Sequence, residues 1–289
     1  MTTQSITSVT DGQKKQIKRL TEDALDRAIA EGLLDKDNAQ KLIGNGDEFQ
    51  ADIVDSIGKR SVSNRFVNEE IESNYAYPEG YKVKGITEQT NILRQLFPGI
   101  GFPLERIAEQ PLPVGAEGWF AIPKWQTMGA TYNEAVEKVF TMIASKRNFC
   151  NYREGALGAE FLRQHARTAK MFETLEVQQK DHGILVVPAQ FGLRHRGRSV
   201  RRAREVFAAN EFGLGAFAIG IMLLTHPERE VRWRQLNVDC AGDEYCPGAD
   251  GRFGKAPLFY FYDDRVEFDT SWFGNASEGC GSASAFLAQ

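Results

Sequence analysis

The longest apolar run of the chain, residues 212–225 (FGLGAFAIGIMLLT), places the strongest constraint on its fold. A membrane-spanning helix needs about 20 consecutive apolar residues, so this run is too short to cross a bilayer. It contains three glycines and is followed directly by His226 and Pro227. We therefore predict that the run is buried inside a globular body, as a core helix or as a pair of strands.

The composition of the chain is that of an ordinary globular protein, with 289 residues of which 42% are hydrophobic and 26% are charged. Its net charge of −4 excludes a surface that binds polyanions throughout, so any contact with phosphate or nucleic acid needs a local basic patch. Four cysteines do not form a disulfide framework, and residues 1–19 lack the apolar core of a secretory signal. We expect a soluble, cytoplasmic protein without a membrane partner.

Apolar residues at spacings of three and four predict helices over much of the chain. Residues 11–57 read as three short helices, the third of them capped by Asp47. The helix expected after residue 198 has Ser199 at its N-cap. The other expected helices lie in four ranges, which are residues 87–97, 131–147, 157–178 and 199–210.

Strand patterns are concentrated toward the end of the chain. Residues 183–189 (GILVVPA) read as a buried strand, and residues 118–125 as an edge strand because they contain Pro123. Residues 258–268 read as a hairpin that turns at Asp263 and Asp264. The aromatic tail over residues 272–287 is too apolar to be free, so we expect it to fold back on the body or to dock on a partner.

This order predicts an α+β fold, with a helical N-terminal layer followed by a mixed α/β body and a β-rich C-terminal part. We predict a helical N-terminal segment over residues 1–80 and a main domain over residues 81–289. No phosphate-binding loop, zinc-protease motif, EF-hand or nucleophile elbow is present in the sequence. Residues 213–218 match a loose dinucleotide pattern but follow a predicted helix, so their glycines favour close packing instead.

A cluster of arginines is the first candidate site. Six arginines and one histidine fall within eleven residues, between a predicted strand and the start of a predicted helix. A helix start offers free N–H groups and a partial positive charge, and guanidinium groups match the geometry of phosphate. The alternative is a network of ion pairs with the chain's 39 acidic residues. The expected anion-binding residues are Arg194, His195, Arg196, Arg198, Arg201 and Arg202, with Arg204 at the end of the cluster.

An acidic segment that contains two cysteines is the second candidate site. Paired carboxylates there would bind a hard cation or perform acid–base chemistry, if burial raises the pKa of one of them. The candidate catalytic residues are Asp239, Asp243, Glu244 and His226. Cys240 and Cys246 with Cys280 would also allow a zinc site or a cysteine nucleophile, although their spacing is not typical of zinc. The alternative is a set of turns that join strands around small buried cysteines.

Three hypotheses follow from these segments. The first is a binding protein that holds a phosphorylated ligand, a nucleotide or a nucleic acid through the arginine cluster. The second is a hydrolase that uses the acidic residues with His226. The third is a structural or assembly subunit that binds a protein partner or itself. No motif identifies a cofactor or a set of metal ligands.

Overall fold

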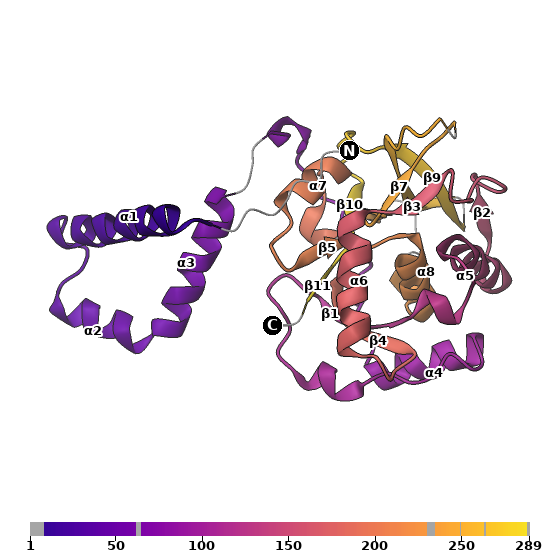
Figure 1. The fold of residues 1–289 in the computed structure, drawn as a ribbon, viewed down its shortest axis with the longest axis horizontal. Helices are drawn as coiled ribbons and strands as arrows, with labels where there is room; N and C mark the ends of the chain where they lie inside the picture. Colours follow the sequence, from indigo (N-terminus) through magenta and orange to yellow (C-terminus); the bar gives the residue numbers. More distant parts are fainter. Residues whose placement is uncertain (1–8, 62–64, 230–234, 249, 263, 288–289) are drawn as a thin grey trace. The chain divides into compact units, whose positions relative to one another are not determined.

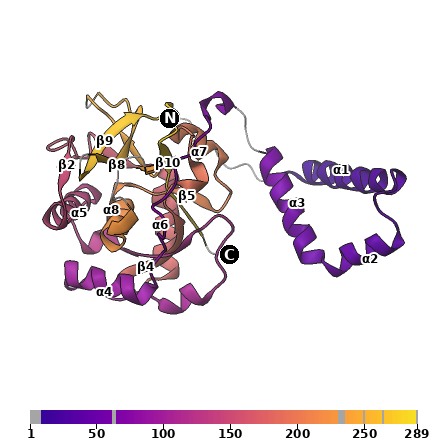
Figure 2. The same cartoon turned by 180° about the vertical axis from the view of Figure 1, so that it is seen from behind.

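The computed structural model describes residues 9–61, 65–229, 235–248, 250–262 and 264–287. It separates the chain into two compact units, residues 1–61 and residues 62–289, which Figures 1 and 2 show from opposite sides. The boundary lies earlier in the chain than the predicted division after residue 80. Each unit is described by itself below.

The first unit consists of three helices, as predicted. Thr10 and Gln13 form a capping box at the start of the first helix, and Asp35 caps the second. The third helix begins at Gly46, so Asp47 lies in its first turn and not at the cap. No described residue of this unit is buried. The helices are α1 (Asp11–Ala30), α2 (Lys36–Gly44) and α3 (Gly46–Ser61).

The second unit contains five α-helices and eleven strands within its described residues, which confirms the α+β class. The helices are α4 (Ile86–Leu96), α5 (Tyr132–Lys146), α6 (Ala166–Gln178), α7 (Val200–Val206) and α8 (Ala216–Thr225). Short 3₁₀ helices lie between them at Val67–Glu69, Glu105–Glu109, Trp125–Thr127, Leu193–His195 and Pro227–Arg229.

The strands form two sheets. Those of the smaller sheet are β1 (Gly118–Pro123), β4 (Ile184–Gln190), β5 (Glu211–Gly213) and β11 (Ser284–Phe286). Those of the larger sheet are β2 (Phe149–Asn151), β3 (Leu162–Gln164), β6 (Asn237–Asp239), β7 (Asp243–Tyr245), β8 (Lys255–Tyr262), β9 (Arg265–Trp272) and β10 (Cys280–Ser282).

The smaller sheet has the order β1-β4-β11-β5, and all its pairs are antiparallel. β11 comes from the predicted aromatic tail and fills the position between β4 and β5, with Ala285 opposite both Ala189 and Phe212. The tail therefore folds back on the body, as expected. β1 is an edge strand, and the side chain of Gln89 bonds to the backbone of Trp119 and Ala121 along that edge.

The larger sheet is built around the β8–β9 hairpin, which confirms the predicted hairpin. Asp264 has a φ of 64°, and Asp263 lies outside the described residues. β6 and β7 both pair with β8, β3 pairs with β7, and β2 pairs with β9. Its core face carries Phe259 and Phe268, whose rings pack against Phe140 of α5.

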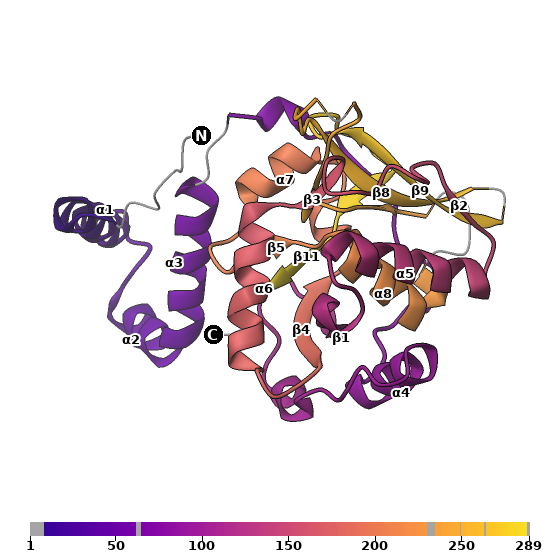
Figure 3. The ribbon, with the colours of Figure 1, turned by 45° about the vertical axis from the view of Figure 1, so that its right-hand side comes forward.

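The apolar run becomes a strand followed by a helix, β5 and α8. All ten residues of α8 are buried, and the helix packs against α5 and β1 in one continuous core (Figure 3). Across the described residues, no helix combines the length and apolarity needed to span a membrane.

Two helices are shorter in the structure than the sequence pattern predicts. Residues 157–165 are not helical, because β3 pairs there with β7 and buries Leu162 against the core. The helix capped by Ser199 ends at Val206, where Phe207 turns into a small second core with Val200 and Ala203. In both places tertiary packing outweighs local helical periodicity.

Asp243 fixes the start of α8 from outside the helix. Its buried carboxylate accepts hydrogen bonds from the backbone N–H of Ala216 at 2.7 Å and from the hydroxyl of Tyr132 at 2.9 Å. Gly215 precedes the helix, and a Cβ atom at this position would overlap both Asp243 and Tyr132. Burial raises the pKa of Asp243 to about 7.

We expect the substitution Asp243→Asn to change how stability depends on pH. Because the folded state raises the pKa of Asp243 above 3.8, its contribution is fully present below pH 3.8 and is lost as the pH rises to about 7. Between pH 3.8 and about 7 the wild type should therefore lose stability relative to the variant, by up to about 1.4 kcal/mol in free energy of unfolding per pH unit. The melting temperature of the variant should rise relative to that of the wild type over the same range. Thermal melts at several pH values test this. The exposed Asp181→Asn variant is the control, and a pH-independent difference for Asp243→Asn would contradict the assignment.

Candidate functional site

The backbone holds the arginine cluster against two distant segments. Gly197 donates to the carbonyl of Cys280, and its own carbonyl accepts from the N–H of Ile71. The N–H of Ser199 bonds to the carbonyl of Glu69. These bonds bring the acidic residues at 69 and 70 next to α7.

The outer arginines of the cluster form ion pairs with those acidic residues. Arg201 pairs with Glu69, and Arg202 pairs with Glu70. Arg202 also reaches Glu205 at 2.9 Å, and Arg198 reaches Glu70 at 3.4 Å. This part of the cluster therefore fits the ion-pair interpretation better than a free anion site.

The inner residues of the cluster meet Glu211, which is fully buried. Its carboxylate bonds to Nε2 of His195 at 2.7 Å and to the hydroxyl of Ser284 at 2.6 Å, with Nε of Arg194 at 3.3 Å. Burial alone would raise the pKa of Glu211, but these partners lower it to about 2. Arg196 instead donates to the carbonyl of Tyr75.

The start of α7 has few donors left for a ligand. The N–H of Arg202 donates to the hydroxyl of Ser199, as the predicted N-cap requires, and the N–H of Arg201 donates to the carbonyl of Phe273. The helix has only seven residues. These two backbone donors are therefore already engaged within the protein.

A basic pocket lies on another side of α7, with a volume of about 280 Å³. Only Arg201 and Arg204 of the cluster reach it. The other basic side chains, His165 and Arg167, come from the start of α6, and one acidic residue, Glu205, shares the lining. The walls are completed by the rings of Phe66 and Phe207.

Two arginines of the basic pocket have no acidic partner among the described residues. Arg204 donates to the carbonyls of Ala241 at 2.9 Å and Asp243 at 2.6 Å, and burial lowers its pKa to about 10. Arg167 donates to the carbonyl of Ala209 at 3.1 Å, and its Nε is buried without a hydrogen-bond partner. Burial also lowers the pKa of Arg167. Both cations are thus partly desolvated, and no described carboxylate forms an ion pair with either.

The N-terminus of α6 adds positive potential to the same pocket. His165 is its N-cap, and Nδ1 accepts from the N–H of Arg167 at 3.3 Å. The first turn of this 13-residue helix contains no acidic residue and does contain Arg167, which opposes the helix dipole. Burial and the charge of Arg204 lower the pKa of His165 to about 4, so the imidazole is neutral at physiological pH.

Tertiary bonds hold the start of α6 against the segments at Gly213 and Gly242. The N–H of His165 donates to the carbonyl of Gly242, and the hydroxyl of Thr168 donates to the carbonyl of Gly213 at 2.9 Å. The sequence carried no signal for His165 and Arg167, because a predicted helix ran through both positions. Only the observed start of the helix at Ala166 makes His165 a cap and places Arg167 in the first turn.

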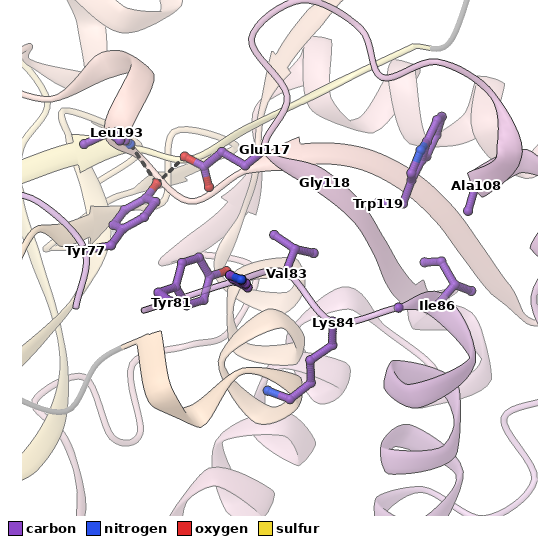
Figure 4. A pocket seen from close by; sticks show the side chains of 12 residues that line it. Tyr77, Tyr81, Val83, Lys84, Ile86, Ala108, Glu117, Gly118, Trp119 and Leu193 are labelled. Atoms are coloured by element: carbon purple, nitrogen blue, oxygen red, sulfur yellow. Dashed lines mark hydrogen bonds between the residues drawn. The ribbon is translucent and has the colours of Figure 1, made fainter. Parts of the chain in front are cut away.

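A larger cavity of about 620 Å³ lies elsewhere, beside β1 (Figure 4). Its polar end contains Glu117, which accepts from the hydroxyl of Tyr77 at 2.5 Å and from the N–H of Phe191 at 3.1 Å. The hydroxyl of Tyr77 accepts in turn from the N–H of Leu193. Lys84 pairs with Glu228. Burial raises the pKa of Glu117, but its oxygens and the Lys84 ammonium already have partners within the protein.

The four candidate catalytic residues do not share a pocket. Asp243 binds the first residue of α8, whereas His226 follows the last, so ten helical residues or about 15 Å separate them. Nε2 of His226 accepts from the N–H of Lys84. Glu244 pairs with Arg163 on the other face of β7. Asp239 is buried on β6, and burial is the only cause that raises its pKa to about 7.

The cysteines are all free thiols. Cys246 donates to Asp250 at 3.1 Å. Over the part of the chain that the structure describes, no group of three or more histidine, cysteine or acidic side chains is placed to hold a metal ion. The zinc alternative therefore has no support in the geometry.

Comparison of the chain with protein-family models, with curated protein sequences and with solved structures found no match in any of the three.

We expect Glu211→Gln to destabilise the protein by about 3–5 kcal/mol, because it removes the buried charge that Arg194 and His195 face. The native contact lowers the pKa of Glu211, so its contribution is present above pH 4.5 and is lost as the pH falls toward 2. Urea unfolding at neutral pH measures the effect. Glu173→Gln, on the exposed face of α6, should change stability little. An equal effect of the two substitutions would show that Glu211 is not the anchor of the cluster.

Proposed function

We propose that this protein binds a small phosphorylated ligand in the basic pocket formed by His165, Arg167, Arg201 and Arg204. The observation that carries the proposal is the pair of partly buried guanidinium groups, Arg167 and Arg204, neither of which forms an ion pair with a carboxylate among the described residues. An anionic ligand supplies the charge that these groups lack.

Burying a charged side chain away from water is costly. A desolvated cation costs several kcal/mol unless an anion accompanies it, and proteins generally pair such groups. Four other arginines of the cluster follow that rule, with Glu69, Glu70 and Glu211 as partners; they are Arg194, Arg198, Arg201 and Arg202. Arg167 has no such acidic partner among the described residues. It also places a cation in the first turn of a helix, where the helix dipole opposes positive charge. Departures of this kind are expected at functional sites, where stability is given up for binding.

Size and charge favour a small ligand over a nucleic acid. A cavity of about 280 Å³ holds a phosphate group with a small organic body, which the rings of Phe66 and Phe207 would flank. The net charge of −4 opposes a nucleic-acid backbone outside the pocket. The larger cavity beside β1 supports this function less well, because Glu117 and Lys84 are already bonded within the protein. The four free thiols favour a cytoplasmic location for this activity.

We expect Arg167→Met to weaken the binding of phenyl phosphate about ten- to a hundredfold, the loss of one charge-assisted hydrogen bond of roughly 1.5–3 kcal/mol. In the absence of ligand, the same variant should be as stable as the wild type or more stable, because it removes a desolvated cation from a helix start. Isothermal titration calorimetry and thermal melts measure the two effects. Lys82→Met, at the exposed rim of the larger cavity, is the matched control and should leave binding unchanged.

Two results would contradict the proposal. One is a wild-type protein that binds neither phenyl phosphate nor inorganic phosphate at low ionic strength. The other is equal binding by the wild type and Arg167→Met. A third result, binding of a single-stranded oligonucleotide with steep salt dependence while phenyl phosphate does not bind, would assign the basic pocket to a nucleic-acid backbone instead.

The neutral imidazole of His165 predicts how binding depends on pH. A base whose folded pKa is lowered to about 4 stays uncharged at pH 5.5 and above, so it adds no charge to the pocket over that range. The affinity for sulfate, which remains a dianion, should therefore be constant between about pH 5.5 and 8, while that for phenyl phosphate rises as its second proton, with a pKa of about 6, is lost. Titration calorimetry with both anions tests this. Sulfate binding that strengthens below pH 6.5 would show that His165 is protonated with the ligand.

A further inference from the structure

Helix α1 leaves a stripe of apolar side chains uncovered. Ile17, Leu20 and Leu25 are 45%, 65% and 46% exposed, and none of the residues of α1 is buried. Ala24 and Ala28 extend this face, at spacings of four from Leu20 to Ala24 and from Ala24 to Ala28. A continuous exposed stripe of this kind marks an interaction surface, because a helix gains most of its stability in a protein from burying such a face.

The charges of α1 are divided between its two halves. Residues 11–20 carry four basic side chains and one acidic, a net charge of +3. Residues 21–31 carry four acidic side chains and one basic, a net charge of −3. The basic residues of the first half are Lys14, Lys15, Lys18 and Arg19, and the acidic residues of the second half are Glu22, Asp23, Asp26 and Glu31.

This order of charges does not serve the helix itself. The macrodipole favours acidic side chains near the N-terminus and basic ones near the C-terminus, and only Asp11 and Arg27 follow that preference. Pairing along the helix adds little, because its three ion pairs are all exposed to solvent. They are Asp11 with Lys14 at 4.0 Å, Lys18 with Glu22 at 3.9 Å and Arg27 with Glu31 at 3.4 Å. The division of charge therefore requires a partner outside the helix to become favourable.

We propose that α1 is a self-association helix, and that two copies of this chain pair through it in antiparallel orientation. A two-fold axis across the middle of the helix places the basic half of one copy against the acidic half of the other, twice. Parallel pairing would place like charges together. The apolar stripe from Ile17 to Ala28 covers about 17 Å of each helix, and Ala24 and Ala28 let the two backbones approach closely.

Charge reversal in the full-length protein tests the pairing. The first variant, K14E/K15E/K18E/R19E, makes both halves of α1 acidic, and the second, E22K/D23K/D26K/E31K, makes both halves basic. Each variant repels itself and should be monomeric in sedimentation equilibrium, where the wild type is dimeric. Mixed in equal amounts, the two variants should form a heterodimer, and the variant that carries both sets of changes should be dimeric again.

Loss of the α1 helix would not explain monomeric variants. Each single set of reversals improves the match to the helix dipole, so circular dichroism should show no loss of helix. Reversal of Lys36 and Lys41 to Glu on α2 is the control and should leave the dimer intact. A wild type that is monomeric at all concentrations would overturn the proposal and would assign the apolar stripe to the second unit of the same chain. Single variants that stay dimeric, or that do not associate on mixing, would overturn it as well.

Discussion

The carboxylate of Asp243 is the contact on which the core and the basic pocket both depend. It closes the N-terminus of α8, the most apolar helix of the protein, and ties that helix to Tyr132 at the first residue of α5. The carbonyl of the same residue accepts from Arg204, which lines the basic pocket. Loss of this anchor would therefore disturb both the position of α8 and the direction of a pocket arginine. A buried residue with two partners at its carboxylate and a third at its carbonyl is well suited to such a role, because no water competes for its hydrogen bonds.

The arginines divide into two groups that differ in their partners. Those that face Glu69, Glu70 or Glu211 hold the loop after β4, the segment at residues 69–71 and the final strands together. Those that face the basic pocket bond only to backbone carbonyls, apart from Arg201, which joins both groups. Carbonyls orient a guanidinium group without neutralising it. The pocket therefore keeps its positive charge, and the surrounding ion pairs hold its shape.

The two units differ in how much of their apolar surface they bury. The second unit buries its apolar residues in one large core, whereas the described part of the first unit buries none. Its helices are well capped, at Thr10 and Asp35, so they are specified locally. Their apolar surface and the charge order of α1 would add stability only if another surface covered them. Self-association through α1 would join two copies of the second unit, each with its own basic pocket.

Local features of the sequence determined much of the architecture. The cap at Ser199, the turn residues of the β8–β9 hairpin and the apolar run of α8 act over a few residues, and an element of the predicted kind forms at each. Burial of the run followed from its composition alone. The helix predicted over residues 157–178 was wrong at its start, because pairing of β3 with β7 is a contact across about eighty residues that periodicity does not record.

The candidate site was decided almost wholly by tertiary structure. The sequence showed that arginines gather near residue 200, but it did not show which of them meet a carboxylate. Glu69, Glu70 and Glu211 reach the cluster through strand pairing and backbone bonds between distant segments, and α6 brings His165 and Arg167 to the pocket in the same way. The distance between Asp243 and His226 likewise follows from the helix that separates them. Charge and periodicity are properties of neighbouring residues, whereas the pairing of a buried charge depends on which segments the fold brings together.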